Sequence, residues 1–170
     1  VYIGHSAQQL GNAALVIRTA AVPDSNPEIE EARRRGLPVL ERAQAWGLLM
    51  QGYNHALCVA GTHGKTSTTS MLTEVLLCAH MDPTVMVGGE LPMIGGSLRI
   101  GAKDLFVAEA CEYRNSFLSF LPTIAILLNI ERDHLDFFSS TDDIIHSFHR
   151  FACLVPEKEG LVVANGEDPH

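Results

Sequence analysis

The 170-residue sequence has little of several features that mark particular protein classes. It has 12 Lys and Arg against 20 Asp and Glu, a formal net charge of −8. Proteins that bind phosphate backbones carry a surplus of Lys and Arg, so we expect no nucleic-acid partner. No apolar run approaches the roughly 18 residues of a membrane-spanning helix, so no membrane partner is expected. The 46% hydrophobic and 19% charged residues are instead typical of a globular protein with a sizeable core.

Cysteine is scarce and widely spaced. The four residues, Cys58, Cys78, Cys111 and Cys153, form no Cys-x-x-Cys pair of the kind used for zinc binding or redox chemistry. The first five residues have neither the basic region nor the long apolar stretch of a signal peptide. We therefore expect reduced thiols in a cytoplasmic protein.

Short apolar runs alternate with helical patterns, which predicts an α/β fold with a mainly parallel sheet. Asn26 is placed to cap a helix whose first turn is acidic and which ends in arginines before Gly36. The expected strands are residues 1–4, 14–20, 38–40, 55–60, 84–87, 104–108, 123–129 and 161–164. The expected helices are residues 27–35, 42–50, 66–80 and one that starts at residue 141.

The polar stretch at residues 51–54 predicts a domain boundary near residue 53. A first domain of roughly fifty residues is too small for a stable α/β unit. The sequence also stops at a turn-like segment, residues 165–170, directly after a predicted strand. We expect a fragment: residues 1–53 from the end of one domain and residues 54–170 from the start of another.

The most informative segment is a glycine-containing turn between a buried strand and an amphipathic helix. Its candidate nucleotide-binding residues are Gly61, Thr62, His63, Gly64, Lys65, Thr66 and Ser67. Glycines let backbone N–H groups approach phosphate oxygens, and the helix N-terminus adds partial positive charge. Lys65 is placed to neutralise the β and γ phosphates, and the Thr66 hydroxyl to bind Mg²⁺. ATP and Mg²⁺ are therefore the expected cofactors.

The segment departs from the general phosphate-loop pattern, which has a glycine where this chain has Val59. The alternative interpretation is a strand–helix turn with an incidental Gly-Lys-Thr. The strand before and the helix after the turn favour the phosphate loop, in the shorter form Gly-Thr-x-Gly-Lys-Thr.

With this loop, the sequence resembles the Mur ligase family, ATP-dependent ligases of peptidoglycan precursor synthesis. The loop Gly61–Thr66, with histidine at its variable position, most resembles the loop of the family members that use L-alanine. The likeness extends over nearly the whole chain, through Ile3–His5, Val22–Glu28, Pro38–Leu40, Glu109–Ala110, Ser116–Leu118, Asn129–Glu131 and Asp133–Asp136.

The resemblance implies a Rossmann-like UDP-sugar-binding domain ending near residue 53, then the first part of a P-loop-type ATP-binding domain. It implies UDP-N-acetylmuramate and L-alanine as substrates. The muramoyl carboxylate would attack the γ phosphate to give an acyl phosphate, and the amine of L-alanine would then displace phosphate. The C-terminal domain that brings the amino acid would lie outside this sequence.

Glu109 and His134 each follow a predicted strand, so the carboxyl edge of a parallel sheet would bring both near the phosphate loop. Alone, either side chain could be solvated or structural. The resemblance implies that both bind a second metal ion and act in catalysis with Lys65, while Thr66 binds the first. Asp133 and Asp136 are candidate partners of His134. His5 is a candidate UDP-sugar contact or a structural cap.

One segment departs from the family. Many members have Glu-Ala-Asp-Glu-Ser-Asp where this chain has Glu109-Ala110-Cys111-Glu112-Tyr113-Arg114. Cys111 has no adjacent base in the sequence, so we interpret it as a packing residue and not as a nucleophile.

Three other functions remain open at this stage. One is a recycling ligase that attaches a ready-made tripeptide to the same sugar nucleotide. Another is a plain P-loop ATPase or kinase, which leaves the first fifty or so residues without a role. The third is an ATP-binding fragment without catalytic turnover.

Overall fold

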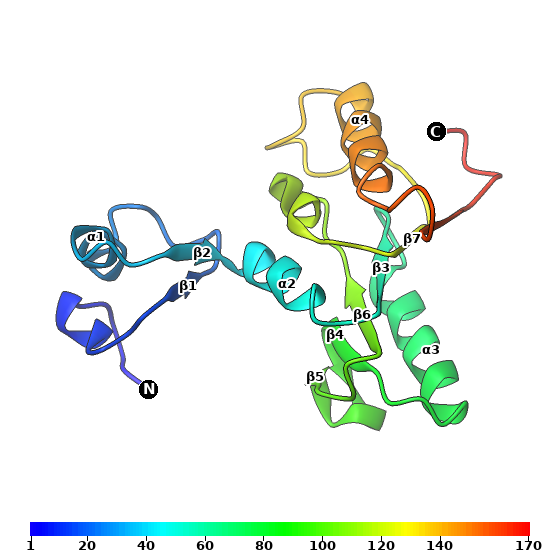
Figure 1. Ribbon diagram of the computed structural model, residues 1–170. Coiled ribbons are helices and arrows are strands. Elements are labelled where there is room, and N and C mark those ends of the chain that lie inside the picture. Colours follow the sequence, from blue (N-terminus) through cyan, green and yellow to red (C-terminus); the bar gives the residue numbers. More distant parts are fainter. The chain divides into compact units, whose positions relative to one another are not determined.

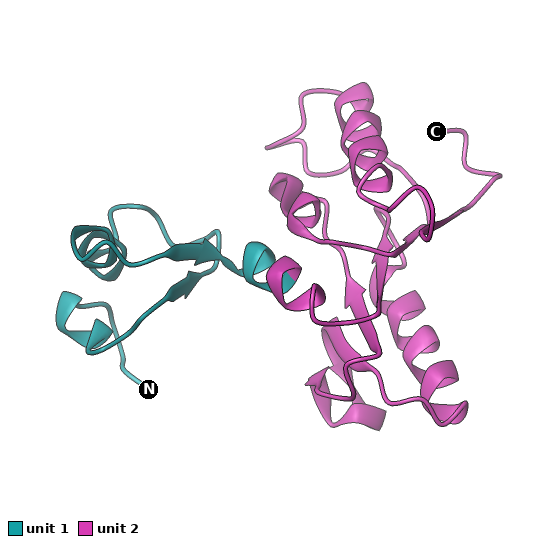
Figure 2. Cartoon of the chain, viewed as in Figure 1, with its two compact units in different colours: residues 1–46 teal, residues 47–170 magenta.

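The computed structural model describes all of residues 1–170, and it divides into two compact units, residues 1–46 and 47–170 (Figure 2). The first unit contains a two-stranded sheet and the second a six-stranded sheet. No helix has both the length and the apolar character needed to cross a membrane.

The first unit packs one helix and a 3-10 turn around a short parallel sheet. Its elements are η1 (Ala7–Leu10), β1 (Val16–Arg18), α1 (Pro27–Arg34) and β2 (Val39–Glu41) (Figure 1). The division between the two units falls within α2 (Arg42–Met50) (Figure 2). The strand predicted at residues 1–4 is wrong. Val1, Tyr2 and Ile3 are exposed and pair with no other strand.

The predicted cap of α1 is confirmed. The Asn26 side chain accepts a hydrogen bond from the backbone N–H of Glu28 at 2.9 Å. The helix then buries Ile29 and Ala32, which form the unit's small core together with Leu10 of η1. The acidic start and basic end of α1 also complement the helix dipole.

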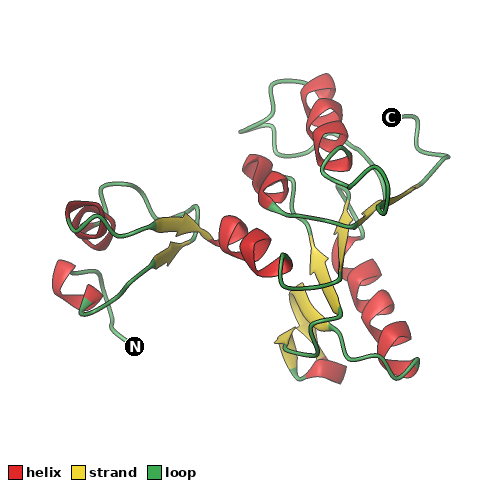
Figure 3. Cartoon of the chain, viewed as in Figure 1, coloured by secondary structure: helices red, strands yellow, loops and turns green.

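The second unit is a mainly parallel sheet with helices, as the alternating pattern predicts (Figure 3). The strand order is β5-β4-β6-β3-β7-β8. The elements are β3 (His55–Ala60), α3 (Lys65–Cys78), β4 (Thr84–Leu91), η2 (Pro92–Ile94), β5 (Gly96–Arg99), β6 (Leu105–Glu109), η3 (Tyr113–Ser119), β7 (Ile124–Leu127), α4 (Thr141–Ala152) and β8 (Leu161–Ala164).

The antiparallel strand β5 is absent from the sequence-based prediction. It pairs with β4 through a short connection at residues 92–95, and the β4 register shifts between Met86 and Leu91. The four residues of β5 are partly or fully exposed and have no apolar alternation. A polar edge strand of this length carries too weak a periodic signal to be recognised.

The core of this unit surrounds β3, in which Ala56 to Ala60 are all buried. Helix α3 lies alongside β3, β4 and β6 (Figure 1). Phe117 of η3 stacks on Phe151 of α4, with ring centroids 4.6 Å apart, and meets the edge of Phe148 at 5.3 Å. These aromatic contacts fix η3 against α4 and so hold the segment that follows β6.

The register of the central strands sets the position of the site. Val59 of β3 is paired with Glu109 of β6 and with Ile126 of β7. Because all three strands run in parallel, the segments that leave their carboxyl ends emerge at one edge of the sheet. The loop before α3, the end of β6 and the segment after β7 therefore lie together.

The charged cluster of the first unit gives a testable pH dependence. Hydrogen bonds from Arg34 and Arg35 lower the pKa of Glu31 from its ordinary 4.5 to about 2. The carboxylate is thus favoured in the folded state, and its stabilising contribution is complete above pH 4.5 and is lost as the pH falls through 2.

We expect NMR titration of the Glu31 side-chain carboxyl to give a midpoint near 2. The double variant Arg34→Gln/Arg35→Gln should return the midpoint to the ordinary glutamate range, since both donors are then neutral. An unchanged midpoint in that variant would show that the two arginines do not stabilise the carboxylate.

Candidate functional site

The glycine-containing loop connects β3 directly to α3. Gly61 has φ 151° and Gly64, at the N-cap of α3, has φ 83°, both in the region that favours glycine. A Cβ at Gly61 would also come within 2.9 Å of the Leu128 side chain. No side chain caps α3, so the positive end of the helix faces the loop.

Asn129, just beyond β7, holds the loop in place. Its side-chain oxygen accepts from the backbone N–H of His63 at 2.8 Å, and its side-chain nitrogen donates to the His63 carbonyl at 3.0 Å. The Asn129 carbonyl accepts from the N–H of Thr62 at 3.0 Å. The Thr62 hydroxyl accepts from the N–H of Glu131 at 2.8 Å. The loop conformation is therefore fixed from the neighbouring strand.

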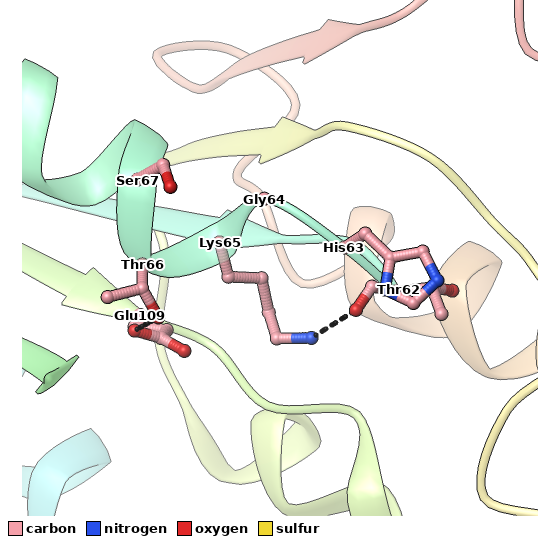
Figure 4. A pocket seen from close by; sticks show the side chains of 7 residues that line it. All are labelled: Thr62, His63, Gly64, Lys65, Thr66, Ser67 and Glu109. Atoms are coloured by element: carbon pink, nitrogen blue, oxygen red, sulfur yellow. Dashed lines mark hydrogen bonds between the residues drawn. The ribbon is translucent and has the colours of Figure 1, made fainter.

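Lys65 is turned back over the loop. Its ammonium donates to the carbonyls of Gly61 and Thr62, the second at 3.0 Å (Figure 4). It also forms an ion pair with Glu112, 3.0 Å from Oε2, and donates to Oε1 at 3.2 Å. The ammonium thus has partners on the loop and, in Glu112, on the segment after β6.

Thr66 and Glu109 meet on the other side of Lys65. The Thr66 hydroxyl donates to Glu109 Oε2 at 2.9 Å, and the backbone N–H of Gly88 donates to the same oxygen at 2.8 Å. Figure 4 shows the two side chains pointing toward each other. Glu109 is the last residue of β6. The sequence-based prediction places it directly after the end of that strand.

An open pocket of about 340 Å³ joins these groups. It is lined by Thr62, His63, Gly64, Lys65, Thr66, Ser67 and Glu109 (Figure 4). All the residues predicted for the phosphate loop except Gly61 line it, and Gly61 precedes them directly. An ammonium, a hydroxyl and a helix N-terminus around an open space suit a polyphosphate.

His134 lies at the same edge, in contact with Glu112 and not with Glu109. It is in a turn beyond β7 with φ 53°, and its Nε2 is 3.5 Å from Glu112 Oε1. The Tyr113 ring packs on the imidazole at a centroid distance of 4.8 Å. Of the two candidate partners, Asp133 accepts from the backbone N–H of His134 and its Oδ2 lies 4.0 Å from Nε2 of the ring, and Asp136 accepts from the Tyr113 hydroxyl.

The oxygens of Thr66 and Glu109 fit a magnesium ion. Both are hard oxygen donors in contact with one another at the rim of the phosphate pocket, and Mg²⁺ is commonly held by one or two protein oxygens with phosphates and waters. No group of three or more His, Cys, Asp or Glu side chains is arranged to enclose a metal ion by itself. A bound phosphate would have to supply further ligands.

The remaining candidates have other surroundings. His5 belongs to the first unit, where its Nδ1 lies 3.1 Å from Glu28 Oε1. All four cysteines are free. Desolvation by burial raises the pKa of the Cys111 thiol, which fits the interpretation that Cys111 is not a nucleophile.

Two residues of the site have no role in the sequence-based prediction. They are Glu112, which is paired with Lys65, and Asn129, which holds the loop. Both follow the carboxyl end of a central strand, and polar residues at that position are the signal that could have identified them.

The sequence matches two family descriptions. "Mur ligase middle domain" covers residues 59–170, and "Mur ligase family, catalytic domain" covers residues 1–54. A UDP-N-acetylmuramate–L-alanine ligase of Clostridium botulinum (strain Okra / Type B1) is 49% identical over 99% of this chain. The chain spans 36% of that protein, about a third of the length of its curated relatives.

Solved structures of two related ligases are also similar. The UDP-N-acetylmuramate–alanine ligase of Thermotoga maritima has a TM-score of 0.84 at 32% identity, over 98% of this chain and 38% of its own. The UDP-N-acetylmuramate:L-alanyl-γ-D-glutamyl-meso-diaminopimelate ligase of Neisseria meningitides has a TM-score of 0.87 at 32% identity, over 99% of this chain and 57% of its own.

The contact between Gly88 and Glu109 can be tested by adding one methyl group. A Cβ at Gly88 would lie 2.8 Å from Glu109 Oε2 and 3.0 Å from its Cδ. The carboxylate is the flexible end of its side chain, so we expect Gly88→Ala to displace it from Thr66 while changing stability by less than about 1 kcal/mol.

A crystal structure of Gly88→Ala shows whether the Glu109 carboxylate is displaced. Thermal unfolding of the same variant measures the change in stability. Gly166→Ala is the matched control, because a Cβ there meets nothing within 4 Å. If Glu109 keeps its hydrogen bond to Thr66 in Gly88→Ala, the close approach of Gly88 does not determine the position of the carboxylate.

Proposed function

The chain belongs to the Mur ligase family, and from this premise we propose that it is part of an ATP-dependent ligase that joins L-alanine to UDP-N-acetylmuramate. The observation that carries the proposal is the grouping of Lys65, Thr66 and Glu109 around one open pocket at a helix N-terminus. The 49% identity to an L-alanine ligase supports the choice of amino acid.

In this proposal residues 54–170 begin the ATP-binding domain and residues 1–53 end the UDP-sugar domain. His5 is then a candidate contact for the sugar nucleotide. The domain that delivers L-alanine lies outside these residues. ATP and nucleotide sugars are cytoplasmic metabolites in this scheme, and the free cysteines are compatible with that location.

The protein's contribution to the reaction is binding and charge neutralisation. The loop N–H groups and the N-terminus of α3 bind the phosphates, and Lys65 neutralises the charge that develops when the γ phosphoryl group is transferred. Thr66 would hold a first Mg²⁺ with Glu109 beside it, and Glu109 and His134 would hold a second metal ion with the substrates. Bound Mg²⁺ supplies further charge neutralisation and orients the phosphate oxygens.

The acyl phosphate requires a carboxylate held in line with the γ phosphate. The amine of L-alanine then attacks the acyl carbon and inorganic phosphate leaves. No residue of the chain forms a covalent bond to the substrate in this sequence of steps, so positioning provides the rate enhancement.

The tripeptide ligase is the second candidate, because the Neisseria structure has a TM-score as high as that of the L-alanine ligase. A competition assay on the full-length gene product, with L-alanine and the tripeptide present together, separates the two. Preferential incorporation of the tripeptide would overturn the assignment to L-alanine.

Lys65→Ala should abolish transfer of the γ phosphoryl group and leave the fold intact, since Lys65 lines the open pocket and His134 still faces the Glu112 carboxylate when the ammonium is gone. We expect a loss of at least about a thousandfold in acyl-phosphate formation, typical of a lost charge on a transferring phosphate. Trapping the acyl phosphate as a hydroxamate measures it. Retained hydroxamate formation would contradict the role of Lys65.

Glu109→Gln tests the metal role with a nearly isosteric change. The neutral amide is a weaker ligand than a carboxylate, so the Mg²⁺ concentration for half-maximal activity should rise about tenfold or more. Glu74→Gln, on the exposed face of α3, is the matched control. An unchanged Mg²⁺ requirement would remove Glu109 from the metal site.

A further inference from the structure

The ammonium of Lys65 has no free donor in this structure. A lysine ammonium has three N–H bonds, and here its three acceptor groups are the carbonyls of Gly61 and Thr62 and the carboxylate of Glu112. A phosphate that enters the pocket must therefore replace at least one of these acceptors. The carbonyls belong to the loop itself, so Glu112 is the partner that competes for the charge of Lys65.

Glu112 is buried as deeply as a core residue, with 2% of its side chain exposed. It faces two basic groups, the Lys65 ammonium at 3.0 Å and His134 Nε2 at 3.5 Å. Its Oε2 accepts no hydrogen bond, although the ammonium lies beside it. A buried carboxylate without a partner is costly, so a departing Lys65 leaves His134 as the group that can compensate.

The backbone around Glu112 keeps the carboxylate from following Lys65 into the pocket. Its carbonyl accepts from the N–H of Asn115 at 2.8 Å, and Arg114 and Asn115 both have left-handed conformations, with φ 53° and 57°. The segment is anchored by Phe117 in the aromatic core. Glu112 is therefore a fixed point, while the long side chain of Lys65 can move.

The His134 ring is held close to Glu112, where it can form a hydrogen bond once Lys65 moves away. Tyr113, the residue after Glu112, packs on the imidazole and is tied through its hydroxyl to Asp136 at 2.7 Å. The distance of 3.5 Å from Nε2 to Glu112 Oε1 is longer than a good hydrogen bond. A small movement of the ring would form one.

We propose that Glu112 is a positioning residue that couples the arrival of phosphate at Lys65 to the placement of His134. In the arrangement described here the carboxylate holds Lys65. When a polyphosphate takes the ammonium, Glu112 turns to His134 and fixes its ring by a direct hydrogen bond. The inference rests on the proposed function, because it requires that phosphates bind at Lys65.

The coupling can be observed without metal and without turnover. The full-length gene product, labelled with ¹⁵N in the histidine rings, is titrated with inorganic tripolyphosphate in the presence of a metal chelator. We expect the ring signals of His134 to shift as the site fills, while those of His146, exposed on α4, stay in place. A saturating titration that leaves the His134 ring unchanged overturns the coupling, whatever the variants show.

Glu112→Gln keeps the shape of the side chain and removes its charge. In this variant the binding of tripolyphosphate no longer has to break an ion pair between Lys65 and a carboxylate. We therefore expect calorimetry to show about tenfold tighter binding of tripolyphosphate. The shift of the His134 ring signals on binding should be lost. A purely structural role predicts the opposite change, weaker binding. Weaker binding in a folded variant, or a His134 response equal to that of the wild type, contradicts the proposal.

Glu131→Gln is the matched control for the loss of a negative charge near the loop. Glu131 is 61% exposed and lies 3.7 Å from His63, without contact to Lys65. The affinity of the Glu131→Gln variant for tripolyphosphate should differ from that of the wild type by less than about twofold, because exposed charges are screened by solvent. An increase equal to that of Glu112→Gln would show a general charge effect and overturn the specific role of Glu112.

Lys65→Ala separates failure of this inference from failure of the proposed function. Tripolyphosphate that binds the wild type but not Lys65→Ala supports the phosphate site, and the behaviour of Glu112→Gln then decides the coupling alone. If the wild type does not bind tripolyphosphate, or if Lys65→Ala binds it equally well, the assignment of the phosphate site at Lys65 is wrong. The proposed coupling is then wrong as well.

Discussion

The parallel pairing of β3 with β6 and β7 is the constraint on which the site depends. Val59 is in register with Glu109 on one side and with Ile126 on the other. A shift of one residue between β3 and β6 would reverse the faces of the strand and separate Thr66 from Glu109. Because β3 is buried on both faces, its apolar side chains oppose such a shift, and the core thereby determines the geometry of the polar edge.

The charged groups of the site are paired with one another within the protein. Lys65 is compensated by Glu112, and Glu109 is stabilised by hydrogen bonds from Thr66 and from the backbone of Gly88. A site that is to receive an anion and a cation together gains from holding both kinds of charge paired within the protein, because neither charge is then buried without a partner. The ligands then exchange partners with the protein.

The sequence predicts several elements well because their signals are local. The strands at residues 55–60 and 161–164 and the helix at 42–50 have the predicted bounds, since apolar runs and breaks in polarity mark both ends. The strand at residues 1–4 failed because an apolar run becomes a strand only beside a partner. Glu112 escaped prediction for a similar reason: its partners, Lys65 and His134, come from distant parts of the chain.

A crystal structure of the full-length gene product with a non-hydrolysable ATP analogue and Mg²⁺ tests the account most directly. We expect the Lys65 ammonium to leave Glu112 and contact the β and γ phosphates, the metal to lie on Thr66 and Glu109, and His134 to lie within hydrogen-bonding distance of Glu112. A triphosphate bound away from the loop, with Lys65 still paired to Glu112, would contradict it.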